Sequence, residues 1–244
     1  MHKLLASTSD CLNIFRIDEQ DYVHKCELKN YQYKELASPM TSFAWNPVEY
    51  NQICCSSIDT TCSLWDIEHQ ALSKLVITHD KEVFDVSFCP DGKSFATVGA
   101  DNTARFFDTR NLNESTIIHE HEEPLIRIAW NNSTTSHLIA LTTLTGNDII
   151  LLDIRQPLYP VSKLTFHQKP INNLVWSPES PFLLCSISGD QHAYLWNVEN
   201  LQSENCVPIL EYSSEIPLNN VEWCNYLDWI GISKENSFIM LRIF

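Results

Sequence analysis

The sequence lacks any long apolar run. No stretch approaches the roughly 18 apolar residues that a membrane-spanning helix requires. The apolar part of the N-terminus, within Met1–Ala6, is too short for a secretory signal peptide. We therefore expect no membrane association and predict a soluble, intracellular protein that works in the nucleus and the cytoplasm.

The short motifs of metal centres and hydrolases are also missing. The nine cysteines include no C-x-x-C pair and no spacing typical of zinc sites. We therefore expect buried, reduced thiols, and we predict no metal and no cofactor. No G-x-S-x-G turn, which carries the nucleophile of many hydrolases, occurs in the sequence. The chain is accordingly predicted not to be an enzyme.

Basic residues are few. Lysine and arginine number 16 against 31 aspartates and glutamates, which gives a formal net charge of −15. A surface with this charge repels nucleic-acid phosphates and suits basic segments of other proteins. We expect protein partners and no direct binding of nucleic acid.

An aromatic residue that ends an apolar segment recurs at intervals of 43, 42, 46 and 47 residues, at Trp45, Phe88, Trp130, Trp176 and Trp223. A second landmark recurs at intervals of 42, 45 and 44 residues, at Trp65-Asp66, Phe107-Asp108, Leu152-Asp153 and Trp196-Asn197. Repeats of about this length are typical of the blades of a WD-type β-propeller, each of which holds four short strands.

Each second landmark is preceded, six residues upstream, by a residue suited to a tight hairpin: Asp59, Asp101, Gly146 and Asp190. Such residues tolerate either a positive φ or a turn closed by their own side chain. Between the turns lie short apolar runs such as Ile149–Leu152, which are typical of strands covered on both faces. The sequence therefore predicts an all-β fold.

The predicted strands group into one WD-repeat propeller domain over residues 1–244. It consists of a partial blade at 1–30, full blades at about 38–78, 79–119, 120–166 and 167–212, and a partial blade at 213–244. These 22 strands make five to six blades, whereas a closed ring leaves no open sheet edge. Unless the ring closes with fewer strands, we expect the chain to be truncated at the N-terminus relative to a seven-bladed ring.

Several segments resemble one particular group of WD-repeat proteins. They are Pro39–Asn46, Ser56–Cys62, His79–Val83, Val98–Asp101, Ser115–Ile118 and Asn219–Trp223. These blocks are similar to the anthocyanin-regulator and Transparent Testa Glabra family, whose animal members are DDB- and cullin-associated adaptors that bind DYRK-type kinases. The resemblance implies a seven-bladed scaffold without catalysis. The chain departs from the generic repeat at Phe15, Phe107, Leu152 and Leu241, where tryptophan is usual.

Three histidines, His79, His121 and His167, each lie nine residues before a strand-end aromatic. By resemblance to WD repeats, such a histidine joins the hairpin aspartate, a strand serine or threonine and the tryptophan in a buried hydrogen-bond network. Two networks are expected: His167 with Ser186, Asp190 and Trp196, and His79 with Thr97, Asp101 and, in place of tryptophan, Phe107. We predict a structural role for them, because buried polar groups need partners.

Two candidate contact surfaces remain. The loop after His79 presents Asp80, Lys81 and Glu82, and we predict that it docks a kinase or transcription-factor segment unless it is merely a solvated loop. Arg110 and Arg155 end Asp-Thr-Arg and Asp-Ile-Arg triplets, which resemble the Trp-Asp-x-Arg box of cullin-ligase substrate receptors. The alternative is that each arginine only caps its strand or pairs with a neighbouring blade.

The sequence thus predicts a non-enzymatic protein–protein interaction scaffold that assembles kinases or transcription regulators. The second hypothesis is a substrate receptor of a cullin-RING ubiquitin ligase, which would bind the ligase adaptor through Arg110 and Arg155. The third is a chromatin module that binds histone tails or other basic tails, which the net negative charge favours.

Overall fold

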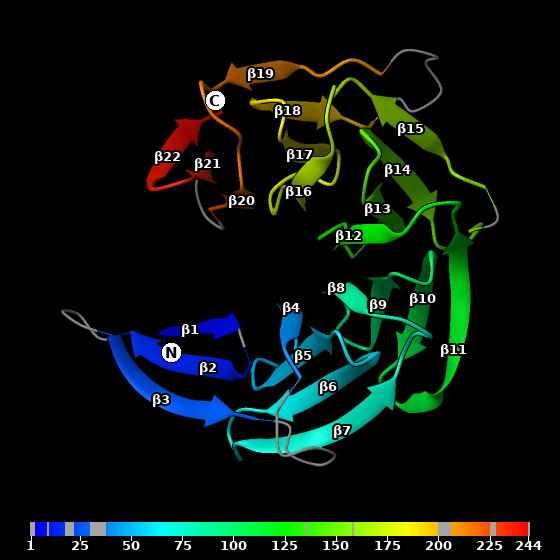
Figure 1. The fold of residues 1–244 in the computed structure, drawn as a ribbon, viewed down its shortest axis with the longest axis vertical. Helices are drawn as coiled ribbons and strands as arrows, with labels where there is room; N and C mark the ends of the chain where they lie inside the picture. The colour runs from blue at the N-terminus through cyan, green and yellow to red at the C-terminus, as the bar shows by residue number, and fades with distance from the viewer. Residues whose placement is uncertain are drawn as a thin grey trace. The chain divides into compact units, whose positions relative to one another are not determined.

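The computed structural model describes residues 3–8, 10–17, 22–29, 38–134, 136–157, 159–199, 206–224 and 228–243. These residues form strands, turns and loops, and among them there is no helix that could span a membrane. The chain divides into two compact units, Met1–Ile117 and Ile118–Phe244. Figure 1 shows the strands of both, and each unit is described by itself below.

The first unit contains three antiparallel sheets, in the strand orders β1-β2-β3, β4-β5-β6-β7 and β8-β9-β10-β11, except that the last three residues of β11 belong to the second unit. Consecutive strands pair, so each sheet is a simple meander. The bounds are Lys3–Thr8 (β1), Leu12–Ile17 (β2), Tyr22–Leu28 (β3), Met40–Trp45 (β4), Gln52–Ser57 (β5), Thr61–Asp66 (β6), Ala71–Ile77 (β7), Val83–Phe88 (β8), Ser94–Gly99 (β9), Thr103–Asp108 (β10) and Asn111–Glu120 (β11).

The second unit also contains three antiparallel sheets, in the orders β12-β13-β14-β15, β16-β17-β18-β19 and β20-β21-β22. The bounds are Leu125–Trp130 (β12), Leu138–Thr143 (β13), Asp148–Asp153 (β14), Ser162–Thr165 (β15), Ile171–Trp176 (β16), Leu183–Ser188 (β17), His192–Asn197 (β18), Leu210–Ser213 (β19), Asn220–Trp223 (β20), Trp229–Lys234 (β21) and Ser237–Arg242 (β22).

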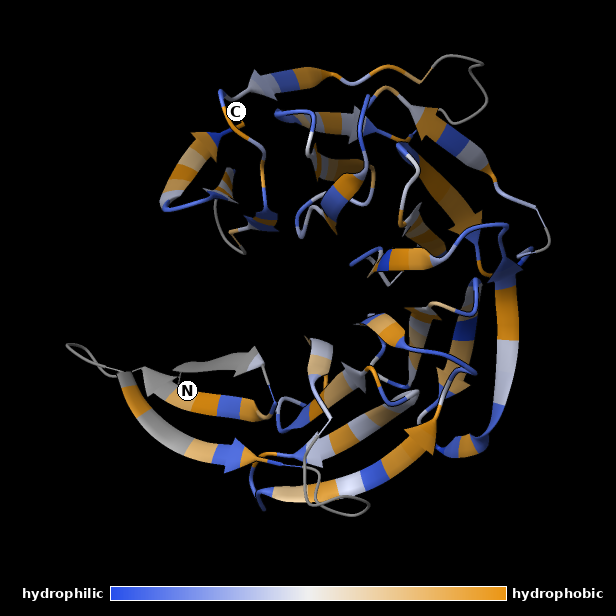
Figure 2. Cartoon of the chain, viewed as in Figure 1, coloured by the Kyte–Doolittle hydropathy of each residue, from blue (hydrophilic) through white to orange (hydrophobic). Residues whose placement is uncertain are grey.

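The middle strands are apolar on both faces because a sheet packs against each face. In β18, Tyr194 and Trp196 join a core shared with the β12–β15 sheet. The alternate residues Ala193 and Leu195 join a core shared with the β20–β22 sheet. Figure 2 shows that the middle of β14 is apolar without a break. Burial on both faces explains why these strands show no apolar-polar alternation.

The hairpins between second and third strands use the aspartates through their side chains. Asp59, Asp101 and Asp190 each accept a backbone N–H from the residue two positions later through Oδ1. The positive φ falls instead on the residue that follows each aspartate, with values of 75°, 68° and 77° at Thr60, Asn102 and Gln191. The sequence allowed the aspartate either to take a positive φ or to close the turn with its side chain. The aspartates close the turn with their side chains.

The periodic tryptophans tie neighbouring sheets of the second unit together. Trp176 Nε1 donates to Ala129 O at 3.0 Å, and Trp223 Nε1 donates to Val175 O at 3.3 Å. In both pairs the acceptor directly precedes the strand-end aromatic of the preceding sheet. The repeat of about 45 residues is thus the distance along the chain between two equivalent contacts.

The cysteines lie within this framework as thiols. All nine are in described residues and none forms a disulfide bond, and six of them are buried. Burial raises the pKa of Cys185 to about 12, which keeps the thiol protonated and weakly reactive.

Candidate functional site

His79 is the centre of a buried polar network in the first unit. Its Nδ1 lies 2.8 Å from Asp101 Oδ1 and its Nε2 lies 2.8 Å from Thr97 Oγ1, and the residue is 1% exposed. Thr103, which the sequence reasoning missed, donates its hydroxyl to Asp101 Oδ1 at 2.8 Å. The structure therefore brings together His79, Thr97 and Asp101 as one group.

Burial lowers the pKa of His79 more than the neighbouring Asp101 carboxylate raises it. Burial also acts to raise the pKa of Asp101, but hydrogen bonds from His79, the Asp80 N–H and Thr103 outweigh it, so the pKa is lowered. A neutral imidazole beside a carboxylate donates its Nδ1–H to that carboxylate. Nε2 is then the acceptor for the Thr97 hydroxyl.

Arg105 extends this network to the surface. One guanidinium nitrogen, Nη2, lies 2.8 Å from Asp80 Oδ2 and 3.0 Å from Asp101 Oδ2, and the Asp80 N–H donates to Asp101 Oδ2 at 3.1 Å. Sequence reasoning missed Arg105. The available signal was that Thr103 and Arg105 alternate on one face of a strand that begins just after the hairpin aspartate.

His167 forms the equivalent network in the second unit. Its Nδ1 lies 2.8 Å from Asp190 Oδ2, its Nε2 lies 2.8 Å from Ser186 Oγ, and Trp196 Nε1 donates to the same Oγ at 2.9 Å. The Gln168 N–H donates to Asp190 Oδ2 at 2.9 Å. All four expected side chains are in contact, and Trp196 and Ser186 are fully buried.

His121 shows a different arrangement, although it has the same spacing in the sequence. Its Nδ1 accepts the Glu123 N–H at 3.1 Å. The strand position that holds Thr97 in β9 and Ser186 in β17 is Leu141 in β13, which offers no hydroxyl. The hairpin after β13 is one residue longer than its counterparts and has Gly146 in place of aspartate. These positions therefore offer His121 neither a strand hydroxyl nor a hairpin aspartate, the two partners that the other histidines use.

The loop Asp80–Glu82 is exposed but anchored at both ends. Asp80 has an 83% exposed side chain held by Arg105, and Glu82 O accepts the Ala100 N–H at 2.8 Å. A Cβ on Gly99 would lie 2.7 Å from Glu82 O, so this backbone approach depends on glycine. Lys81 and Glu82 are both exposed. The loop therefore presents charged side chains on a fixed backbone.

Arg110 and Arg155 adopt one and the same conformation in the two units. Each folds back on the aspartate two residues earlier, with Nη2–Oδ2 distances of 2.6 Å to Asp108 and 2.5 Å to Asp153. Their side chains are 76% and 65% exposed. Hydrogen bonds from Arg110 lower the pKa of Asp108 to about 2. In these ion pairs each arginine therefore binds an aspartate of its own sheet and not one of a neighbouring sheet.

The two candidate surfaces of the first unit lie at opposite ends of the same sheet. Val83 pairs with Gly99 at the end where the Asp80–Glu82 loop enters, whereas Asp108 pairs with Ser94 at the other end. Arg110 lies two residues after Asp108, so the length of the sheet separates the loop from the arginine. Within the described residues, no group of three or more histidine, cysteine or acidic side chains is placed to hold a metal ion.

Comparison with known proteins shows consistent similarity to WD-repeat proteins. The family described as WD domain, G-beta repeat matches residues 72–108 and 158–197. A DDB1- and CUL4-associated factor 7 homolog of Dictyostelium discoideum is 35% identical over 98% of this chain and 75% of its own length. An uncharacterised WD repeat-containing protein of Schizosaccharomyces pombe is 31% identical over 88% of this chain and 55% of its own length. A WD repeat-containing protein of Saccharomyces cerevisiae is 34% identical over 66% of this chain and 35% of its own.

Proposed function

Because the chain belongs to the WD-repeat family that includes the DDB1- and CUL4-associated factor 7 homolog of Dictyostelium discoideum, we propose that it assembles protein kinases or transcription regulators as a scaffold without catalysis. The predicted all-β WD-type propeller fold is confirmed by the blade-type sheets and the family match. A protein-interaction scaffold follows from the same relationship. The kinase and transcription-regulator partners, the DYRK type among them, and the place of action in nucleus and cytoplasm are our proposal.

The anchored loop Asp80–Glu82 is the observation that carries the proposed docking role. A partner that binds charged side chains must order them, and ordering a mobile loop costs binding free energy. Here the hydrogen bonds from the Asp80 N–H to Asp101 and from the Ala100 N–H to Glu82 O already hold the backbone at both ends of the loop. Lys81 and Glu82 can therefore meet a partner with little further loss of conformational freedom.

Exchanging the charges of the loop tests this docking role. Lys81→Glu combined with Glu82→Lys keeps the net charge and is expected to reduce recovery of the kinase or transcription regulator about tenfold in affinity purification, because each partner charge then meets a like charge. The measurement is quantitative mass spectrometry of the purified complexes.

A matched exchange on other exposed residues serves as the control. Lys169→Glu with Glu179→Lys alters two exposed side chains of the second unit by the same chemistry. It should leave recovery unchanged. Equal recovery with both exchanged proteins would rule out the Asp80–Glu82 loop as the docking surface.

A second candidate function is substrate receptor of a cullin-RING ubiquitin ligase. It is favoured by the identical exposed geometry of Arg110 and Arg155 and by the name of the Dictyostelium relative, which associates that protein with DDB1 and CUL4. In this proposal the adaptor replaces or supplements the aspartate that each arginine now contacts.

Removing both arginines separates the two functions. Arg110→Ala with Arg155→Ala is expected to weaken binding of purified DDB1 at least about tenfold, since arginine is one of the residue types that most often carry the binding energy of an interface. Surface plasmon resonance measures the change, and Lys169→Ala is the control for loss of an exposed cation. Unaltered DDB1 binding by the double variant would favour the plain scaffold.

A further inference from the structure

A groove lies between the outermost strands of two consecutive sheets in the first unit. These strands are β7 and β11, which stand at the ends of the strand orders of their sheets (Figure 1). The groove has a volume of about 500 Å³ and is lined by residues 74–77 of β7 and by residues 110–113, where β11 begins. We call it the β7–β11 groove. Both of its walls come from the interior of the sequence and belong to the first unit.

The base of the β7–β11 groove is apolar. Val76 and Leu112 line it, one from each wall, and both join the core that the two sheets share. They are 9% and 8% exposed. In β7, Lys74 pairs with Leu64 of the same core, and cross-strand partners share a face of their sheet. Lys74 therefore stands on the face of β7 that turns toward the β8–β11 sheet.

Two cationic side chains of the groove have donors without a partner. Asp108 accepts from Nε and Nη2 of Arg110, and no contact in the described part of the chain occupies Nη1. The Nζ of Lys74 forms neither an ion pair nor a hydrogen bond with any described residue. Among residues 74–77 and 110–113, which line the groove, there is no carboxylate. Each wall thus offers charged N–H donors, which bind anions most strongly.

The charge of the groove stays positive when the carboxylate beside it is counted. Asp108 balances Arg110, and the charge of Lys74 remains. This sign is the opposite of that of the whole chain, which has 31 acidic and 16 basic residues. An acidic segment that the rest of the surface repels is therefore attracted at this groove.

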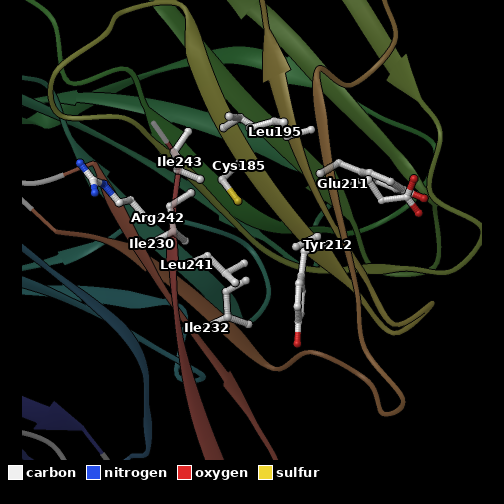
Figure 3. Close-up of a pocket in the computed structure, with 12 residues that line it drawn as sticks. Cys185, Leu195, Glu211, Tyr212, Ile230, Ile232, Leu241, Arg242 and Ile243 are labelled. Carbon is white, nitrogen blue, oxygen red and sulfur yellow. The ribbon is translucent and has the colours of Figure 1, made fainter.

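A groove in the second unit shows the contrasting case (Figure 3). It has a volume of about 250 Å³ and lies between the β16–β19 and β20–β22 sheets, with Leu241 among its lining residues. Its charged lining residues are Glu211 and Arg242, which have opposite signs. Glu211 also pairs with His192 at 2.8 Å. Charge therefore selects no occupant there, whereas the cations of the β7–β11 groove favour an acidic one.

We propose that the β7–β11 groove binds an acidic segment of a partner protein. Glutamate or aspartate side chains of the segment meet Lys74 and the Nη1 of Arg110, and an apolar side chain between them packs on the apolar base. Asp108 keeps its own edge of the guanidinium, so the segment adds to the existing ion pair. Such binding goes beyond both functions proposed above and requires neither the Asp80–Glu82 loop nor DDB1.

A labelled acidic peptide tests this groove. The probe is fluorescent Ser-Glu-Glu-Leu-Glu-Glu-Ser, titrated with the full chain and followed by anisotropy at low ionic strength. Saturable binding is expected. Glutamine in place of every glutamate should weaken it at least about tenfold, and alanine in place of leucine at least about threefold. Because the chain carries a net charge of −15, non-specific attraction would favour a lysine peptide instead.

Lys74→Glu locates the binding at the groove. It reverses the charge of one wall and should weaken binding of the glutamate peptide at least about tenfold. Lys74 is exposed, so the protein should remain folded by circular dichroism. Lys169→Glu makes the same change on an exposed lysine of the second unit and should weaken binding less than about twofold, because salt screens a distant charge.

Asp108→Asn should act in the opposite direction. It removes the carboxylate that holds the Nε and Nη2 edge of Arg110. The guanidinium then carries an unbalanced charge, so binding of the glutamate peptide should strengthen about threefold. Damage to the fold would weaken binding instead, which separates the two explanations.

Three results would overturn this assignment. The first is a dissociation constant for the glutamate peptide above about 1 mM. The second is equal affinity for the glutamate and glutamine peptides. The third is an equal loss of affinity in Lys74→Glu and Lys169→Glu, which would mean that net charge governs binding and the groove does not. None of them bears on DDB1 binding, since the peptide titration contains no adaptor.

Discussion

Trp176→Ala is expected to lower the free energy of unfolding of the second unit by about 3–5 kcal/mol, the usual range for removing a fully buried tryptophan. The side chain is 1% exposed and packs in the core shared by the β12–β15 and β16–β19 sheets. Its indole N–H also donates to Ala129 O. Truncation therefore leaves a cavity between two sheets and a carbonyl without its donor.

Trp176→Phe separates these two contributions. Phenylalanine keeps most of the apolar contact and lacks the N–H, as Phe88 does at the equivalent position of the first unit. There the Phe88 ring lies 5.8 Å from the Phe95 ring at 62°. We expect a loss of about 1–2 kcal/mol, between that of a net hydrogen bond and that of a small cavity.

Urea denaturation followed by far-ultraviolet circular dichroism measures both variants. The control is Tyr159→Ala, which removes an aromatic ring that is 80% exposed and should change the free energy by no more than about 0.5 kcal/mol. A Trp176→Ala variant as stable as Tyr159→Ala would contradict the view that the periodic tryptophans hold neighbouring sheets together.

The aromatic spacing was enough to predict the sheets because each repeat buries the same kind of contact. Trp176 and Trp223 make equivalent hydrogen bonds to the sheet before them, so their spacing in the chain measures one structural unit. The hairpin aspartates were likewise visible, because a tight turn admits few residue types. Such features depend on residues close in sequence or on one repeated neighbour.

What the sequence did not reveal depends on residues from different strands. His121 has the spacing of His79 and His167, yet Leu141 and the longer hairpin at Gly146 give it other partners. Arg105 on β10 reaches Asp80 in the loop before β8, a contact that requires the register of the sheet. The sequence shows that Leu241 stands where tryptophan is usual. Predicting the groove that Leu241 lines would also require knowing which residues of the β16–β19 sheet face it.

Removing the carboxylate of the His167 network is the second large expected effect. Asp190→Ala should lower the free energy of unfolding by about 1–3 kcal/mol, because it strands the buried Nδ1–H of His167 and the Gln168 N–H. The Asp190 side chain is only 5% exposed, so water replaces it poorly. Thermal and urea unfolding both measure the change.

Asp59→Ala is the matched control for that substitution. Asp59 stands at the same hairpin position, where its Oδ1 accepts the backbone N–H and the hydroxyl of Thr61. In the sequence, Leu36 stands nine residues before Trp45, where three other repeats have His79, His121 and His167. We expect Asp59→Ala to lose the turn bonds alone, about 1 kcal/mol. Equal losses for the two variants would mean that the histidine adds nothing to the role of the hairpin aspartate.

The pH dependence of the Asp190→Ala effect identifies the group responsible. Burial acts to raise the pKa of Asp190, but hydrogen bonds from the Gln168 N–H and His167 lower it below its ordinary value of 3.8. The stability that this carboxylate contributes is therefore fully present above about pH 4 and is lost as the pH falls below that value, where the unfolded chain binds a proton more readily. The difference between wild type and Asp190→Ala should persist from pH 7 down to about pH 4 and should shrink from there toward pH 3.

The buried imidazole of His167 adds a separate loss of stability, which occurs as the pH falls through a range above that of the Asp190 carboxylate. Burial lowers the pKa of His167 below its ordinary value of 6.5, although Asp190 opposes this shift. The unfolded chain then takes up a proton below about pH 6.5 while the folded chain does not, so stability falls as the pH drops through that range. Without the opposing carboxylate this loss should persist in Asp190→Ala, and it should be smaller in His167→Gln, where the equivalent contribution of His79 remains. An equal loss in wild type and in His167→Gln from pH 7 to pH 5 would show that His167 is not held neutral in the folded protein.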